Sequence, residues 1–248
     1  MHEDDLTLSL EDLARLLTGE NSLDRTLTRV ATLAVQAIPG AQGAGLTLLQ
    51  QDRPQTVIAT DAFVHQVDEV QYGLGEGPCL SAVAAGRTFT SGNLGGEPMW
   101  PRFGPRVGRL GVHSALSLPL LVNDKPIGAL NVYARPHDSF GPAATRMGEA
   151  FAAPAAVSVA NARALAQAER LVAQLSDALQ SRTEIDQALG IVMSRTGGTS
   201  EQAFRQLRKQ SQTRQVKVVD LAGELIADAV ARARLHRRTT FPEQQVQP

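Results

Sequence analysis

One cysteine and five histidines are the side chains with which this chain could carry out nucleophilic, redox or metal chemistry. Cys79 follows Pro78 at the expected start of a short helix, where a thiolate is favoured, so it is a candidate redox-sensing residue. The alternative interpretation is that Cys79 is a small buried apolar residue. The histidines are scattered along the chain and lack the spacing of metal ligands on one helix.

The sequence lacks the short motifs that usually mark an enzyme. It has no Walker loop, no nucleophile elbow and no zinc motif. Reduction of a sulfoxide would normally need a second thiol to resolve the sulfenate, and Cys79 is the only cysteine. We therefore predict no enzymatic activity, no catalytic residues and no metal.

Composition and charge place the chain among folded proteins of one large or two modest domains. Hydrophobic residues make up 43% of the 248 residues and charged residues 20%. A single cysteine fits a reducing compartment, and neither a secretory signal nor an apolar run long enough for a membrane span is evident. We therefore expect a cytoplasmic protein that does not interact with membranes.

The charge is unevenly distributed. Residues 1–165 hold 12 basic and 16 acidic residues, a net charge of −4, whereas residues 166–248 hold 12 and 9, a net charge of +3. This mild asymmetry places the basic part of the chain in its C-terminal third.

The first two thirds of the sequence are typical of an α+β domain. Segments with helical spacing alternate with two pairs of short strand-like segments. The expected elements are a helix over 23–38, strands Gly45–Leu49 and Thr56–Thr60, a helix Ala62–Tyr72, an irregular Gly- and Pro-rich crossing Gly73–Gly111 with a short helix Cys79–Ala85, strands Ser114–Val122 and Ile127–Ala134, and a helix from Pro142. Because hairpins join the strands, we expect an antiparallel sheet flanked by helices. Residues 1–20 are expected to be an acidic arm with one or two helical turns around Leu6–Leu17.

Four strings within this region resemble those of a known family. They are Gly75-Glu76-Gly77-Pro78-Cys79, Trp100-Pro101 with Phe103, Leu116-Ser117-Leu118-Pro119-Leu120, and Ile127-Gly128-Ala129-Leu130-Asn131-Val132-Tyr133. Together they resemble the GAF domain of actinobacterial regulators, over roughly residues 22–165. The resemblance implies a sensor domain that holds an unidentified small molecule between the sheet and the crossing, with no other cofactor. Candidate lining residues are Trp100, Phe103, His113, Asn131 and Tyr133, and ordinary core packing is the alternative for each.

Beyond this domain, apolar residues step by three and four along a helix. They are Leu165, Ala168, Val172, Leu175 and Leu179, which form an a/d seam of about two heptads. A homodimer through this seam is one interpretation, and packing of the helix on its own domain is the other. Pro154, upstream, is expected to kink or break the helix because proline lacks the N–H that an interior position needs.

Three amphipathic helices are expected after the seam. The first ends at Gly197-Gly198, and Thr199 and Gln202 have the spacing of a capping box at the start of the second. Ile185, Leu189, Val192 and Met193 share one face of the first helix; Phe204 and Leu207 lie on the second, and Val218, Leu221, Leu225 and Ile226 on the third. One shared core can therefore bury all three apolar faces.

Residues along these helices resemble the ANTAR family over roughly residues 178–230. The matching positions are Arg182, Ile185-Asp186-Gln187-Ala188, Gly190, Met193, Ala203-Phe204, Leu207-Arg208, Ser211, Lys217 and Leu221-Ala222. The resemblance implies a dimer that binds paired RNA hairpins in nascent transcripts and so acts indirectly on elongating RNA polymerase, which then reads through a terminator. Candidate RNA-binding residues are Arg182, Ala188, Gly190, Arg205, Arg208, Lys209, Arg214 and Lys217, and a solvated helix face or helix packing is the alternative.

The sequence departs from the ANTAR pattern at three positions. Leu189, Val216 and Val219 stand where members of the family commonly carry basic residues. These departures motivate an alternative function, a dimeric GAF protein-interaction or Cys79 redox-sensing module with weak or lost RNA binding. DNA binding through a helix-turn-helix is a weaker alternative.

The hypothesis that fits most of the chain is a dimeric GAF–ANTAR regulator. It has an arm over 1–20, a GAF domain over 21–163, a coiled-coil linker over 164–180, an ANTAR domain over 181–234 and a flexible tail over 235–248.

Overall fold

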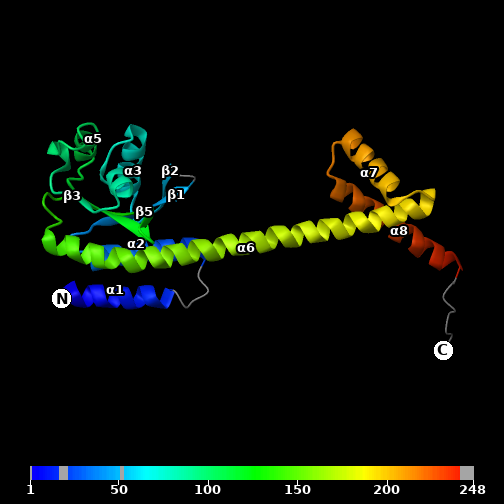
Figure 1. The fold of residues 1–248 in the computed structure, drawn as a ribbon, viewed down its shortest axis with the longest axis horizontal. Coiled ribbons are helices and arrows are strands. Elements are labelled where there is room, and N and C mark those ends of the chain that lie inside the picture. Colours follow the sequence, from blue (N-terminus) through cyan, green and yellow to red (C-terminus); the bar gives the residue numbers. More distant parts are fainter. Residues whose placement is uncertain (1, 17–21, 51–52, 241–248) are drawn as a thin grey trace, which may run out of the picture. The chain divides into compact units, whose positions relative to one another are not determined.

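The computed structural model describes residues 2–16, 22–50 and 53–240. The chain divides into two compact units, Met1–Gln167 and Ala168–Pro248. One helix, α6 (Pro142–Thr196), contributes residues to both (Figure 1).

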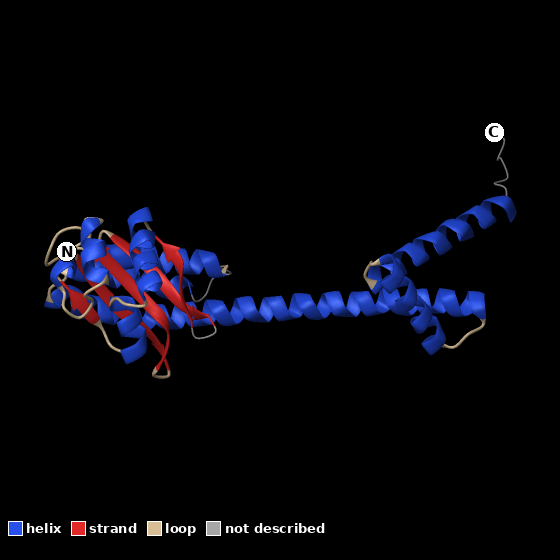
Figure 2. Ribbon diagram, turned by 90° about the horizontal axis from the view of Figure 1, so that it is seen from above, coloured by secondary structure: helices blue, strands red, loops and turns tan. Residues whose placement is uncertain are grey.

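The first unit is built on a five-stranded antiparallel sheet with helices on both faces (Figure 2). Its strands, in the spatial order β2-β1-β5-β4-β3, are β1 (Gly43–Gln50), β2 (Arg53–Ala59), β3 (Phe89–Ser91), β4 (Ser114–Val122) and β5 (Lys125–Ala134). Asn123 and Asp124 join β4 to β5 with φ values of 51° and 59°. Positive φ at both central residues is the geometry of a tight hairpin turn. The expected antiparallel sheet and its second hairpin are confirmed.

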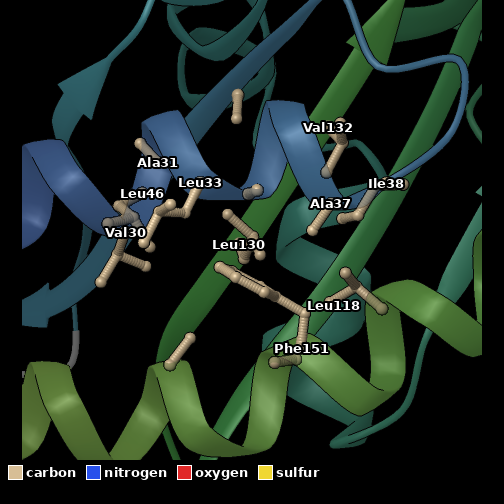
Figure 3. Close-up of a cluster of buried hydrophobic side chains, with 14 of the residues drawn as sticks. Val30, Ala31, Leu33, Ala37, Ile38, Leu46, Leu118, Leu130, Val132 and Phe151 are labelled. Carbon is tan, nitrogen blue, oxygen red and sulfur yellow. The ribbon is translucent and has the colours of Figure 1, made fainter. Parts of the chain in front are cut away.

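One face of the sheet carries an aliphatic core. Because side chains alternate along a strand, Leu46, Leu118, Leu130 and Val132 all point to this face. Helix α2 (Leu23–Ala37) and the first part of α6 cover it, and Phe151 of α6 lies among these leucines (Figure 3). Each large side chain buried here contributes about 1.5–3 kcal/mol. This core therefore fixes both helices on the sheet.

The opposite face is covered by shorter helices. They are α3 (Ala62–Leu74), α4 (Pro78–Ala85), the 3₁₀ turn η1 (Leu94–Gly96) and α5 (Phe103–Arg109). Between α3 and α4, Gly77 has a φ of 150°, and a Cβ there would lie 2.2 Å from Oε1 of Gln71. Glycine is required at this corner, which brings α4 against the sheet.

Three expectations about the first unit need correction. The arm contains a longer helix than expected, α1 (His2–Leu16), whose Leu13 is buried against α2 and whose Asp12 pairs with Arg29. The crossing is also more ordered than expected, since it contains β3 and α5. Finally, α6 continues unbroken through Pro154, because the buried residues Phe151 and Ala155 hold it against the sheet and offset the cost of proline, about 3 kcal/mol.

The second unit is a three-helix arrangement. The end of α6 packs with α7 (Ser200–Arg214) and α8 (Val218–Thr240) around a core that includes Ala188, Val192 and Leu207. Gly197 has a φ of 66°, and the capping box of Thr199 and Gln202 is present. Phe204, expected in the shared core, is 41% exposed instead.

The expected tail was placed too early. Helix α8 runs to Thr240, so residues 235–240 are helical, and residues 241–248 lie outside the described residues. Among the described helices, none combines the length and the apolar character needed to cross a membrane.

Candidate functional site

A cluster of polar side chains lies on the sheet face under α3 and α4. The hydroxyl of Thr47 is its centre: it lies 2.7 Å from Tyr72 Oη and accepts hydrogen bonds from Asn131 Nδ2 at 3.0 Å and from the thiol of Cys79 at 3.3 Å. Thr47, Cys79 and Asn131 are fully buried. Two strands, β1 and β5, and two helices, α3 and α4, thus meet in one polar network inside an otherwise apolar core.

A buried tyrosine–carboxylate pair adjoins this cluster. Tyr133 is fully buried and donates a hydrogen bond of 2.7 Å to Oδ1 of Asp68, which is 1% exposed. Burial, followed by the charge of Asp68, raises the pKa of Tyr133 well above its ordinary value. Tyr133 therefore stays protonated and acts as a hydrogen-bond donor.

Three fully buried polar atoms on this face have no hydrogen-bond partner among the described residues. They are Gln71 Nε2, Ser117 Oγ and Asn131 Oδ1, and Ser117 is the register partner of Asn131 between β4 and β5. Leaving such a group unsatisfied costs about 1–3 kcal/mol. Unused donor and acceptor capacity therefore remains inside this face of the sheet.

The structure places three of the five predicted lining residues in one buried cluster and the other two elsewhere. Trp100, Phe103 and Tyr133 belong to one buried cluster on this face of the sheet, where Trp100 Nε1 donates to Ser81 Oγ at 3.0 Å, whereas Asn131 belongs to the polar network around Thr47. The ring of His113 stacks on His137, with 4.1 Å between centroids. Sequence reasoning missed Thr47, Asp68, Gln71, Tyr72 and Ser117. Polar residues at alternating positions of apolar strands, such as Thr47, Ser117 and Asn131, were the available signal.

Cys79 is a structural thiol in this arrangement. Its backbone N–H donates to Gln71 Oε1 at 2.9 Å, and burial, reinforced by the charge of Asp68, raises the pKa of the Cys79 thiol to about 12. Because only the thiolate is an efficient nucleophile, the geometry does not favour a redox role.

We expect the Cys79 thiol to resist iodoacetamide in the native protein at pH 9, the ordinary pKa of a thiol, and to react rapidly in denaturant. The native thiol stays protonated there, whereas about half of the unfolded thiols are ionised. Mass spectrometry of the alkylated chain measures both rates. Equal rates in the two states would contradict the buried placement.

Glu76 of the Gly-Glu-Gly-Pro string holds the crossing in place. Its carboxylate accepts hydrogen bonds from the backbone N–H groups of Arg102 at 2.7 Å and Phe103 at 3.0 Å, and from Arg102 Nε at 2.8 Å. These bonds, with that from Phe103 the largest cause, lower the pKa of Glu76. The string is therefore explained by folding rather than by catalysis.

In the second unit, the two small residues expected to approach a ligand differ. Ala188 is fully buried in the three-helix core, so helix packing explains it. Gly190 is exposed, and a Cβ at this position would meet no atom within 4 Å. Only Gly190 is therefore available to an external partner.

The six predicted cations divide into paired and unpaired groups. Arg182 lies 3.9 Å from Asp186, Arg205 lies 4.0 Å from Glu201, and Arg214 forms a bidentate pair with Glu224 at 2.6 and 3.1 Å. The other three, Arg208, Lys209 and Lys217, are exposed and form no ion pair with the described residues. These three offer positive charge that is not internally neutralised.

The departures from the ANTAR pattern have a structural explanation. Leu189 is 8% exposed within the three-helix core, and Val216 packs against the same core. Val219 is half-buried. Apolar side chains at these positions therefore contribute to folding.

The a/d seam on α6 is exposed to solvent in the single chain. Leu165, Val172, Leu175 and Leu179 are 49%, 62%, 56% and 67% exposed, and Ala168 is exposed as well. Leu171, one position before Val172, is 56% exposed and widens the stripe. So much exposed apolar surface on one helix indicates an interaction site.

Comparisons with known proteins agree with this architecture. A family model described as GAF domain matches residues 20–160, and one described as ANTAR domain matches residues 173–226. The chain therefore belongs to the GAF domain family. The ANTAR domain that follows makes it a GAF–ANTAR regulator, as the sequence predicted.

Solved structures share the fold of the first unit. The GAF domain of a phosphoenolpyruvate-protein phosphotransferase from Coxiella burnetii is similar at 17% identity with a TM-score of 0.52, covering 64% of this chain and 95% of that one. Free methionine-R-sulfoxide reductase from Neisseria meningitidis, solved with its substrate, is similar at 16% identity with a TM-score of 0.50, covering 64% and 91%. At such identities the likeness extends to the fold alone. A comparison with curated proteins gave no match.

Proposed function

We propose that this chain is a signal-responsive, RNA-binding antitermination regulator of the cytoplasm. A homodimer would bind paired hairpins in a nascent transcript and so let RNA polymerase read through a terminator. The observation that carries the proposal is a folded ANTAR domain with exposed cations, Arg208, Lys209 and Lys217, that no acidic residue of the described chain neutralises. Such cations suit phosphates, whose contacts give a salt-dependent gain in affinity.

The exposed seam of α6 supports the homodimer. Its apolar residues recur at the spacing that a second helix fills in a coiled coil, and they would bury their surface against a second copy. A dimer would carry two ANTAR domains, one for each hairpin of a two-hairpin target. Binding of the second hairpin then becomes intramolecular and gains avidity.

The buried polar face of the GAF domain supports the sensor role. Gln71, Ser117 and Asn131 offer unpaired donor and acceptor atoms there, so a small polar molecule could complete the network. Such a signal acts only if the molecule binds two states of the protein with different affinity. Helix α6 begins in the GAF unit and ends in the ANTAR core, and it would transmit the change.

The alternatives have less support. The apolar residues that motivated loss of RNA binding, Leu189 and Val216, belong to the domain core. The redox alternative needs a reactive Cys79, and the thiol is buried with a raised pKa. An enzymatic role would rest on the fold that the first unit shares with a sulfoxide reductase, and Cys79 has no second cysteine with which to resolve a sulfenate.

We expect the full-length protein to bind a two-hairpin RNA about a hundredfold more weakly in 200 mM than in 50 mM salt, for roughly five phosphate contacts. Lys217→Ala should weaken binding and lower the salt slope by about 1. Fluorescence anisotropy measures both. A one-hairpin RNA is the control for pairing, and Lys125→Ala, at the exposed first residue of β5 in the GAF domain, is the matched control. Undetectable binding at low salt would contradict the proposal.

A further inference from the structure

A groove of about 590 Å³ lies between α6 and α8 in the second unit. Ile191 on α6 and Ile226 and Val230 on α8 give it apolar walls, while Gln187 and Ser194 bring an amide and a hydroxyl to it. Apolar walls with a few polar groups are the usual features of a small-ligand site. The wall that α8 contributes lies largely beyond the residues matched by the ANTAR family model, which end at residue 226. The groove is therefore partly built by the extension of α8.

Gly190 forms part of this groove without an internal reason for being glycine. Glycine inside a helix costs about 0.5–1 kcal/mol relative to alanine. Yet no neighbouring atom lies within 4 Å of a Cβ placed at this position, so packing within the chain does not exclude a side chain. A glycine that is costly and internally unnecessary fits a groove that something from outside must enter closely.

Two arginines supply positive charge to the same groove. Arg195 on α6 lies 3.4 Å from Asp228 Oδ2, and Arg232 on α8 donates to Asp228 Oδ1 at 3.0 Å. The bond from Arg232 is the largest cause that lowers the pKa of Asp228, so the carboxylate stays charged. One carboxylate orients two guanidinium groups and leaves a net positive charge, which complements a phosphate.

We propose that this groove takes an unstacked nucleobase of an RNA loop, with the adjoining phosphate at Arg195 and Arg232. The base would lie between Ile191 and Val230, and Gln187 and Ser194 would hydrogen-bond its edge. Unstacked loop bases are the parts of RNA that proteins read by such contacts. The inference rests on the proposed RNA-binding function and names a site for it.

Filling the groove tests the proposal. Gly190→Leu places a side chain in the open space and should not destabilise the helix, since leucine is a strong helix former. Gly223→Leu is the matched control, because Gly223 is also inside a helix with no atom within 4 Å of its Cβ but does not line the groove. Against a two-hairpin RNA, we expect Gly190→Leu to bind at least about tenfold more weakly, because it loses the apolar and hydrogen-bonding contacts of one base. Gly223→Leu should bind like the parent.

Abasic scanning of the loops identifies the base. Each loop nucleotide in turn is replaced by an abasic one that keeps its phosphate. We expect one position at which the missing base weakens binding by the parent protein about tenfold but leaves the RNA affinity of the Gly190→Leu variant unchanged. Unchanged RNA affinity of Gly190→Leu would overturn the groove while leaving the proposed function intact. If Gly190→Leu sediments as a monomer while the parent is a dimer, the groove is instead a contact with a second copy of the chain. A parent that binds no RNA would overturn both.

Discussion

A chain carrying Leu175→Glu and Leu179→Glu should sediment as a monomer and should lose at least about a hundredfold in affinity for a two-hairpin RNA. Both leucines are more than half exposed in the single chain, at 56% and 67%, so glutamate costs little there. In a pair of helices the same positions would place carboxylates in an apolar seam, where charge is strongly unfavourable. The loss of avidity, which commonly amounts to 10²–10⁴, would then reduce RNA binding.

The matched control adds the same two charges outside the seam. The control is Gln167→Glu with Gln174→Glu. Both glutamines are exposed on the same helix, and neither occupies an a or d position of the heptad. This variant should remain a dimer in analytical ultracentrifugation. If both double variants stay dimeric, the seam is not the interface, and packing of α6 elsewhere becomes the better interpretation.

The features that were predicted correctly from the sequence depend on the conformational preferences of a few adjacent residues. The Asn123-Asp124 turn, the capping box at Thr199 and the glycine stop at Gly197 each involve a few adjacent residues with strong conformational preferences. Pro154 shows the limit of such reasoning. Proline lowers helix propensity locally, but the buried neighbours Phe151 and Ala155 supply tertiary stabilisation that no local window contains.

The candidate sites were harder to predict because they depend on which face of an element is buried. Ala188 and Gly190 are two residues apart, which places them roughly 200° apart around a helix of 3.6 residues per turn. One is therefore in the core and the other in a groove. Likewise, Thr47 and Asn131 are 84 residues apart and meet only through the pairing of β1 with β5. Their grouping follows from strand register.

Phe151→Ala should destabilise the GAF unit by about 3–5 kcal/mol, the cost of removing a fully buried phenylalanine and leaving a cavity. Denaturant unfolding followed by tryptophan fluorescence measures this unit selectively, because Trp100 is the single tryptophan and is 3% exposed in the first unit. Met99→Ala is the control: Met99 is 55% exposed, and its loss should change the free energy of unfolding by no more than about 0.5 kcal/mol.

The large effect expected of Phe151→Ala follows from the position of the ring on α6. Phe151 packs against the aliphatic face of the sheet three residues before Pro154 (Figure 3). Without the ring, the cost of an interior proline, about 3 kcal/mol, is no longer offset, and the first part of α6 should detach from the sheet. A sensor that signals through α6 needs this attachment, so Phe151→Ala should also uncouple any ligand response from RNA binding. Unfolding at the same denaturant concentration as Met99→Ala would show that other contacts hold the helix.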